Sequence, residues 1–305
     1  MPPSSHTIDA DYDLNDYGGA RKPSDKRPLE GLVIIATPIG NAGDITLRAL
    51  DALKSVNVIA CEDTRTSGSL LKRYDVQTPL VPYHEHNAAK MRPKLMERLE
   101  RGETVALISD AGTPLVSDPG YKLVRTCIER SVAVTALPGA SSVLTALTVA
   151  GLPTDRFMFC GFLPNRRKAR KDVLEEIRGV QTTLVFLESP KRLADSLSDM
   201  AEVLGVREAA VTRELTKLFE EVRRGDLATL AEAYGAEPSP KGEVTVVVGP
   251  PAAAEPLNAD QIDALLRDAL INLSVRDASA DVAAKTGLAK RDIYQRALAL
   301  SKEGA

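Results

Sequence analysis

The chain contains no tryptophan, and aromatic residues make up only 4% of its 305 residues. This scarcity argues against a protein that binds single-stranded nucleic acid on a platform of stacked bases. Its three cysteines, Cys61, Cys127 and Cys160, are too few for a disulfide framework, and each lies in an apolar run. We therefore expect buried thiols in a protein of the reducing cytoplasm.

The sequence also lacks a strong excess of one charge and any long apolar run. Its 39 Lys and Arg and 42 Asp and Glu residues leave a formal net charge of −3, which disfavours a strongly basic protein that coats nucleic acid. No run approaches the roughly 18 apolar residues that cross a bilayer, so no membrane partner is expected. The first residues lack the basic and apolar regions of a secretory signal. Hydrophobic residues nevertheless make up 44% of the chain, which is enough for a sizeable core.

Several common catalytic motifs are missing as well. The sequence has no G-x-G-x-x-G, no P-loop, no G-x-S-x-G and no H-E-x-x-H, which disfavours dinucleotide, P-loop and serine-hydrolase chemistry. His84 and His86 lie two residues apart, but no third ligand of matching spacing and no C-x-x-C accompanies them. No metal site is therefore predicted.

From residue 31 onwards, short apolar strands alternate with helical segments. This pattern predicts an α/β protein with mainly parallel sheets covered on both faces. We expect two α/β domains that form a cleft, over residues 31–151 and 152–250. Residues 1–30 have the composition of a disordered tail, and residues 251–256 that of a linker. Residues 257–305 predict a small helical segment, either a helix-turn-helix or a helical hairpin packed on the body.

Four loops follow predicted strands at their carboxyl ends, where α/β proteins form ligand sites. They span residues 37–41, 61–67, 109–120 and 138–142. The third is the most informative, because a compact domain rarely keeps a loop of this length without a use. The loops offer backbone groups, hydroxyls and carboxylates. They offer no lysine or arginine side chains placed to bind a polyphosphate. A ligand with an amine, a carboxylate, a ribose and a sulfonium would suit them, although spacing alone does not name it.

One run of positive charge follows a predicted strand end. Arg166-Arg167-Lys168-Ala169-Arg170-Lys171 places five cations within six residues. A phosphate-binding surface is the functional interpretation, and a solvated helix face is the alternative. Lys191 and Arg192 are candidates to extend this basic run.

The loop motifs together resemble the tetrapyrrole methylase superfamily. They are Ala36-Thr37-Pro38-Ile39-Gly40-Asn41, Glu62-Asp63-Thr64-Arg65, Ser109-Asp110-Ala111-Gly112-Thr113-Pro114 with Ser117-Asp118-Pro119-Gly120, and Pro138-Gly139-Ala140-Ser141-Ser142. Members that modify tetrapyrroles usually carry G-x-G-P-G-D in the first loop and G-D-P in the third. The departures from those strings resemble the branch of ribosomal RNA small-subunit methyltransferases I. The resemblance runs from about residue 32 to 250 and into the helical segment.

This resemblance implies a class III methyltransferase-like fold, S-adenosylmethionine as cofactor, and a homodimer. It also implies methyl transfer to the ribose 2′-oxygen of cytidine 1402 in 16S rRNA of the small ribosomal subunit. The alternative is a methyltransferase of the same superfamily that modifies a small molecule such as a tetrapyrrole. The basic run is evidence against this alternative. A non-catalytic nucleic-acid-binding regulator is a third hypothesis, against which the long third loop speaks.

The resemblance also assigns residues by position. The cofactor cleft is expected to include Pro38, Asp110, Ala111, Gly112, Thr113, Val116, Ser141, Ser142, Glu188, Gly242 and Glu243. A ribose hydroxyl needs a general base or a preorganised proton acceptor, for which Glu62 and Asp63 are the candidates and Glu188 is a rival. Arg65 would orient the RNA or a carboxylate. RNA contacts are expected from Arg166, Arg167, Lys168, Arg170 and Lys171, through backbone and shape rather than through bases.

Overall fold

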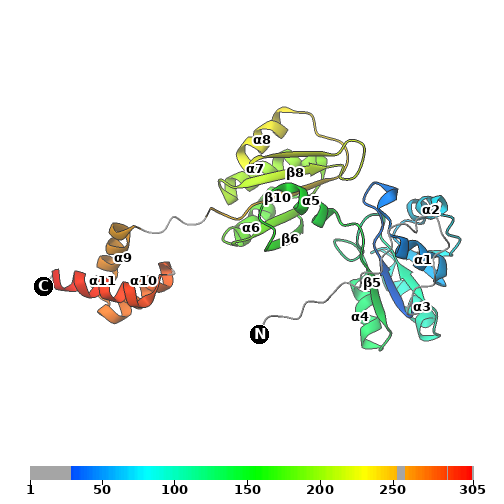
Figure 1. Ribbon diagram of the computed structural model, residues 1–305, viewed down its shortest axis with the longest axis horizontal. Coiled ribbons are helices and arrows are strands. Elements are labelled where there is room, and N and C mark those ends of the chain that lie inside the picture. Colours follow the sequence, from blue (N-terminus) through cyan, green and yellow to red (C-terminus); the bar gives the residue numbers. More distant parts are fainter. Residues whose placement is uncertain (1–28, 253–257, 287, 304–305) are drawn as a thin grey trace, which may run out of the picture. The chain divides into compact units, whose positions relative to one another are not determined.

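The structure is a computed structural model that describes residues 29–252, 258–286 and 288–303. By its internal contacts the chain divides into two units, one up to Pro250 and one from Pro251 onwards. Figure 1 colours the elements along the chain. The tail expected over residues 1–30 lies outside the described residues except for its last two, and so does most of the linker expected over 251–256.

The first unit begins with a five-stranded parallel sheet in the order β3-β2-β4-β1-β5. Its strands are β1 (Leu32–Ile35), β2 (Val58–Cys61), β3 (Leu80–Pro82), β4 (Val105–Leu107) and β5 (Val134–Leu137). Between them lie η1 (Ala42–Asp44), α1 (Leu47–Ser55), α2 (Thr64–Arg73), α3 (Ala88–Glu100) and α4 (Tyr121–Glu129). The proline of β3 is tolerated because this strand lies at the edge of the sheet.

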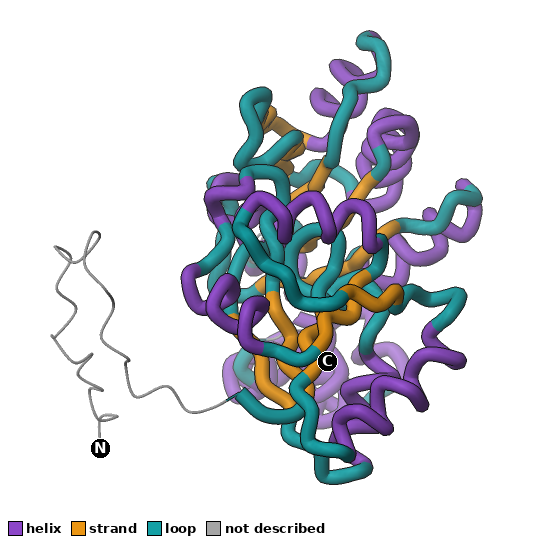
Figure 2. Tube along the Cα trace, turned by 90° about the vertical axis from the view of Figure 1, so that its right-hand side faces the viewer, coloured by secondary structure: helices purple, strands orange, loops and turns teal. Residues whose placement is uncertain are grey.

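Both faces of this sheet are covered, as its unbroken apolar strands predict. Every residue of β2 and of β4 is buried. Alternate residues serve opposite faces: Ile59 packs with Leu53 of α1 and Leu71 of α2, whereas Val58 packs with Leu95 of α3 and Leu123 of α4. Figure 2 shows strands surrounded by helices and loops.

The second sheet of this unit has the order β6-β7-β10-β8-β9. Its elements are β6 (Phe157–Phe162), α6 (Arg167–Ile177), β7 (Thr183–Glu188), η2 (Pro190–Arg192), α7 (Leu193–Leu204), β8 (Glu208–Arg213), β9 (Glu221–Asp226), α8 (Leu227–Ala236) and β10 (Val244–Val248). One face packs on α6, α7 and α8. The sheet therefore has its main core on that side.

The expectation that this sheet is mainly parallel is wrong. Only β6 and β7 pair in parallel, whereas β7–β10, β10–β8 and β8–β9 are antiparallel. The sequence pattern did not predict β9, because Glu-Val-Arg-Arg-Gly-Asp has only one large apolar residue, Val222. This edge strand carries mostly half-buried charged side chains and forms an antiparallel hairpin with β8.

Helix α5 (Ser142–Ala150) packs on the second sheet rather than the first. Its buried residues Val143, Ala146 and Leu147 contact Val185 of β7 and Val247 of β10, on the face opposite α6 to α8. Figure 1 shows α5 beside β6 and β10. The boundary expected near residue 151 thus separates α5 from the sheet that it covers.

The described residues of the second unit form three helices, α9 (Ala259–Asn272), α10 (Val275–Thr286) and α11 (Lys290–Glu303). They bury their own small core of Leu266, Val282, Ile293 and Ala297. Asn258 and Gln261 form a capping box that begins α9. Across the described part of the chain, no helix combines the length and the apolar character that a membrane span requires.

Candidate active site

Backbone hydrogen bonds tie the first loop to the third. The amide N–H of Thr37 donates to the carbonyl of Gly112 at 2.9 Å, and the N–H of Gly112 donates back at 3.0 Å. The buried hydroxyl of Thr37 donates to the carbonyl of Ser109 at 3.0 Å. Gly112 has φ +77°, and a Cβ there would lie 3.3 Å from the Ile39 side chain. Glycine is therefore required both by the backbone conformation and by the close approach.

The third loop is tied in turn to the fourth. The hydroxyl of Thr113 donates to the carbonyl of Ala140 at 3.1 Å. Ser141 is the N-cap of α5, and its hydroxyl accepts a hydrogen bond of 3.4 Å from the amide of Leu144. The positive end of the α5 dipole and its free N–H groups therefore face the loops.

These contacts build a small open pocket beside the N-terminus of α5. It is lined by Ala111, Gly112, Thr113, Val116, Ser141, Ser142, Val143 and Leu187. The pocket combines hydroxyls and backbone amides with a few apolar side chains, and it holds about 260 Å³ of space including its mouth. Such a lining suits a polar ligand with an apolar portion.

Of the eleven residues assigned to the cofactor cleft, the structure brings six to this pocket: Ala111, Gly112, Thr113, Val116, Ser141 and Ser142. Pro38 is buried next to the Thr37–Gly112 bridge, and Asp110 is exposed beside Ala111. The sequence analysis missed Val143 and Leu187. Only the packing of α5 on β7 places these two apolar residues at the pocket.

Glu188 points away from the pocket, contrary to the expectation that it lines the cleft. Successive side chains of a strand alternate between faces. Leu187 lines the pocket, and therefore Glu188 points to the opposite face of the sheet. Phe186 on that face belongs to the apolar core, whereas Glu188 belongs to a polar network.

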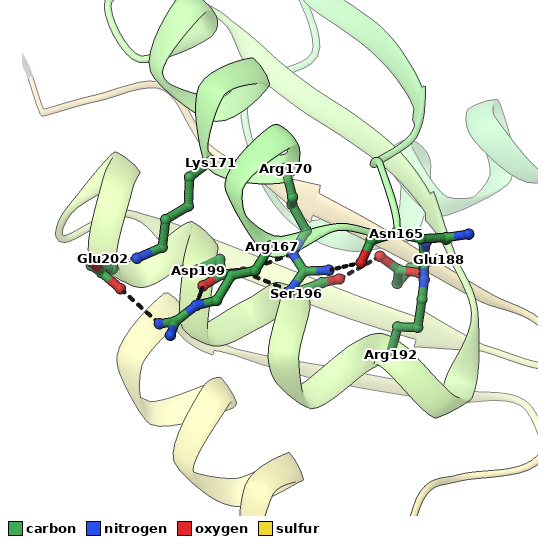
Figure 3. A network of polar contacts seen from close by, with 9 residues as sticks. All are labelled: Asn165, Arg167, Arg170, Lys171, Glu188, Arg192, Ser196, Asp199 and Glu202. Atoms are coloured by element: carbon green, nitrogen blue, oxygen red, sulfur yellow. Dashed lines mark hydrogen bonds and ion pairs between the residues drawn. The ribbon is translucent and has the colours of Figure 1, made fainter.

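The carboxylate of Glu188 is fully engaged on that face. Its Oε1 accepts hydrogen bonds from Arg192 Nε at 2.9 Å and from the amide of Ser189 at 2.6 Å, and its Oε2 accepts one from the Ser196 hydroxyl at 2.5 Å. Figure 3 shows the carboxylate between Arg192 and Ser196. These contacts place the carboxylate of Glu188 in a structural network on the face of the sheet away from the pocket.

Gly242 and Glu243 lie beside the β8–β9 connection rather than at the pocket. Gly242 has φ +96° and lies against the side chain of Glu214. Lys217 binds Glu214 at 2.7 Å and Glu243 at 3.1 Å. This connection also reaches the first loop, because the amide of Asn41 donates to the Thr216 hydroxyl at 3.2 Å.

Asp63 serves as a helix cap and a salt-bridge partner. Its carboxylate accepts the amide of Arg65 at 2.8 Å and pairs with the Arg65 guanidinium at 2.6 Å. Hydrogen bonds from Arg65 lower the pKa of Asp63 to about 2. Such a carboxylate is ionised but weakly basic, and the exposed Arg65 is committed to holding it.

Glu62 has the opposite electrostatic setting. Burial, followed by the negative charge of Asp110, raises the pKa of Glu62. Asp118, which the sequence analysis did not select, belongs to the same group of carboxylates. Burial, followed by the charge of Glu62, raises the pKa of Asp118 to about 6. In the sequence, only the position of Asp118 two residues after Val116 in the third loop could have pointed to it. Its burial and its charged neighbours follow from the fold.

The basic run divides into two sets of side chains. Arg170 is 4% exposed and pairs with the buried Asp199 at 2.6 Å. Arg167 binds Asp199 at 2.9 Å, and Lys171 binds Glu202 at 2.5 Å. Figure 3 shows these three cations of α6 facing the acids of α7. They hold the two helices together, and the burial of Arg170 is at odds with a phosphate contact.

The other two cations of the run, Arg166 and Lys168, are exposed. Helix periodicity explains the division. Positions 167, 170, 171 and 174 share the face that packs on α7, whereas 168 points away from it. Within the described residues, no group of three or more His, Cys, Asp and Glu side chains is arranged to hold a metal ion.

Comparison with known proteins assigns the chain to a family. Residues 31–231 match the family described as Tetrapyrrole (Corrin/Porphyrin) Methylases. The chain belongs to the tetrapyrrole methylase family. Residues 255–301 match the RsmI C-terminal HTH domain, so the three-helix unit also corresponds to a known module.

Curated relatives narrow this assignment. The chain is 51% identical over 276 residues to the Ribosomal RNA small subunit methyltransferase I of Mesorhizobium japonicum, covering 90% of this chain and 94% of that protein. It is 44% identical over 272 residues to the protein of the same name from Escherichia coli O157:H7, covering 88% and 94%. Within the tetrapyrrole methylases, it therefore belongs to the family of ribosomal RNA small subunit methyltransferases I.

Solved structures share the two-sheet fold. Diphthine synthase superposes with a TM-score of 0.57 at 15% identity, covering 76% of this chain and 92% of that one. Uroporphyrin-III C-methyl transferase from Thermus thermophilus, complexed with S-adenyl homocysteine, superposes with a TM-score of 0.50 at 19% identity, covering 72% and 97%. At these identities the likeness shows the fold alone.

Proposed function

We propose that this protein uses S-adenosylmethionine to methylate the ribose 2′-oxygen of cytidine 1402 in 16S rRNA of the small ribosomal subunit. The observation that carries the proposal is similarity along nearly the whole length of curated ribosomal RNA small subunit methyltransferases I, through both the methylase region and the helical unit. The proposal includes a homodimer in the cytoplasm. It also includes the division of the chain into two α/β domains and a helical segment.

The lining of the pocket beside α5 suits the chemical groups of the proposed cofactor. S-adenosylmethionine carries a carboxylate, an amine, a ribose and a sulfonium. The hydroxyls of Thr113, Ser141 and Ser142, with the N–H groups at the start of α5, would bind its anionic and hydroxyl groups. Val116 and Leu187 supply apolar contacts. Gly112 lets the third loop pack closely against Ile39 of the first loop, which holds the pocket-lining backbone in place.

When bound, the cofactor supplies the methyl group on its sulfonium. The residues of this chain hold the ribose hydroxyl in line with that group, and positioning contributes much of the rate gain. The proton of the 2′-hydroxyl would pass to a carboxylate of this chain as the oxygen–methyl bond forms and the methyl–sulfur bond breaks. Glu62 and Asp118 suit this role better than Asp63, because an acceptor works best when its pKa is raised toward the working pH. Both are coupled to Asp110, which adjoins the pocket.

The test uses purified protein, methyl-labelled S-adenosylmethionine and small ribosomal subunits from a strain that lacks this gene. The labelled nucleotide is then mapped. We expect 2′-O-methylcytidine at position 1402. Label at another RNA position would refute the assigned site, and cofactor binding without RNA label would favour a small-molecule acceptor such as a tetrapyrrole.

Variants then identify the proton acceptor. Glu62→Gln and Asp118→Asn are each expected to lower the single-turnover rate roughly 10²-fold or more while cofactor affinity changes little. Asp63→Asn is the matched control, since it removes a carboxylate of the same group whose pKa is lowered rather than raised. A larger loss with Asp63→Asn than with the other two would reverse the assignment.

A further inference from the structure

Phe162 is an aromatic side chain whose exposure the fold does not explain. It ends β6, and 57% of its surface is exposed to solvent. The next residue, Leu163, is buried in the core under α6 and α7. The chain therefore enters the core directly after it presents a large apolar ring to solvent.

The register of β6 places this ring on the pocket side of the sheet. Partners in a parallel pair lie side by side on the same face. Phe162 pairs with Leu187, which lines the pocket. A bulge between Phe159 and Gly161 is responsible. Without the extra residue, Phe162 would fall on the opposite face from Phe159, which packs with α5.

The third loop approaches β6 at the same point. A Cβ on Gly161 would lie 3.7 Å from the hydroxyl oxygen of Ser117. Ser117 follows Val116, which lines the pocket and is itself 39% exposed. Phe162 thus lies beside a pocket-lining residue of β7, and the third loop reaches the residue that precedes it.

A clamp of buried ion pairs fixes the segment that follows Phe162. The side chain of Asn165 accepts a hydrogen bond from Arg192, which Glu188 holds, and the Asn165 carbonyl accepts one of 3.4 Å from Arg170, which Asp199 holds. Figure 3 shows Asn165 beside Arg192 and Glu188. Glu188 and Asp199 are therefore positioning residues for this segment.

The clamp brings two exposed cations together. Arg166 follows Asn165, and Lys191 precedes Arg192, so the Asn165–Arg192 contact joins the segments that carry them. Both side chains are exposed, and neither forms an ion pair within the part of the chain that the structure describes. The linked segments, the first of which begins directly after the strand that ends at Phe162, thus carry two exposed cations. Cations with an aromatic ring match a nucleotide, whose phosphate is anionic and whose base is flat.

We propose that Phe162 stacks on a nucleobase of the RNA substrate at the edge of the methyl-transfer pocket, and that Arg166 and Lys191 bind its flanking phosphates. This rests on the proposed RNA methyltransferase function. Sequence-specific recognition of RNA commonly targets single-stranded segments, whose unstacked bases stack on an aromatic side chain of the protein. The scarcity of aromatics excludes a platform of several rings, but one ring serves one base.

The test compares Phe162→Ala with Phe162→Tyr in the full-length protein. Affinity for a fluorescein-labelled single-stranded RNA that spans the target cytidine is measured by anisotropy. Loss of one stacked base is expected to weaken binding roughly ten- to hundred-fold in Phe162→Ala, whereas Phe162→Tyr retains the ring and stays within about threefold of wild type. S-adenosylmethionine affinity, measured by calorimetry, is expected to be unchanged in both.

Phe157→Ala is the matched control. Phe157 lies on the same strand, is 41% exposed, and pairs with Thr183, on the same face as Leu187 but at the far end of β6. We expect its RNA affinity to equal that of wild type. Equal affinities for Phe162→Ala and wild type would overturn the stacking role. So would a shift from dimer to monomer in Phe162→Ala by light scattering, because the ring would then be a subunit contact.

Salt dependence tests the phosphate contacts. Arg166→Gln and Lys191→Gln are each expected to lower the slope of log affinity against log salt by about 0.7, the value for one phosphate of a single strand. Arg178→Gln, at the other end of α6, is the control and should leave the slope unchanged. An unchanged slope in the first two variants would overturn their role. The methyl-transfer assay on wild-type protein tests the proposed function separately, because the RNA affinities are measured without methyl transfer.

Discussion

At the scale of single residues, carboxylates that look alike in the sequence have different chemistry in the structure. Asp63 is held by Arg65, so its pKa falls to about 2. Asp118 is half-buried near Glu62 and Asp110, so its pKa rises to about 6. Neighbouring groups decide the basicity of each carboxylate, and spacing along the chain does not reveal those neighbours.

Asp118 should make stability depend on pH. Its pKa is higher in the folded protein than its ordinary value of 3.8, so protonation favours the folded state. That contribution is fully present below about pH 4 and is lost as the pH rises through about 6. Asp118→Asn should therefore raise the free energy of unfolding at pH 8 by on the order of 1 kcal/mol, after allowance for solvent screening.

Urea denaturation of both proteins at pH 4 and pH 8 measures this effect. The difference between variant and wild type should shrink toward zero at the lower pH. A difference of equal size at both pH values would mean that Asp118 titrates normally and that the substitution acts through packing instead.

At the scale of elements, opposite charges hold α6 on α7. The side chains of Arg170 and Asp199 are 5% and 2% exposed, whereas that of Glu202 is 56% exposed. Burial makes the first pair costly to break, because the remaining partner would keep an uncompensated charge in the core. The exposed pairs with Glu202 are screened by solvent.

Asp199→Ala should accordingly lower the free energy of unfolding by about 3–5 kcal/mol. Glu202→Ala, which removes the neighbouring acid of the same helix, should lower it by less than about 1 kcal/mol. Equilibrium urea unfolding of the two variants at pH 7 gives both values. Similar small losses in the two would show that Arg170 finds another partner or solvent when Asp199 is removed.

At the scale of the whole molecule, the two units have separate cores. All the residues that line the pocket precede Pro250, and the helices after it bury their own apolar residues. The first unit therefore contains the complete set of proposed cofactor contacts.

A chain that ends at Pro250 should bind S-adenosylmethionine with an affinity within about twofold of the full-length protein. The physical reason is that no proposed contact is removed. Calorimetry on both forms measures the affinity, and circular dichroism confirms that the shorter chain is folded. A tenfold loss of affinity in a folded truncated chain would mean that the helical unit contributes to the cofactor site.

The parallel sheet of the first half and the four loops could be predicted from the sequence. Buried parallel strands are unbroken apolar runs, and loops that close on a ligand need glycine, proline and hydroxyl residues in local patterns. The resemblance of these loop motifs to the tetrapyrrole methylases assigned six of the pocket residues, from Ala111 to Val116 and from Ser141 to Ser142. These features depend on neighbours along the chain.

Features that depend on residues distant in the sequence could be seen only in the folded chain. The antiparallel pairing of β9 follows from its partner β8, and the burial of Arg170 follows from Asp199 on another helix. One bulged residue in β6 turned Phe162 toward the pocket, while strand alternation turned Glu188 away from it. A side chain's face is determined by the register of its whole strand, and its charge state by groups that folding brings within hydrogen-bonding distance.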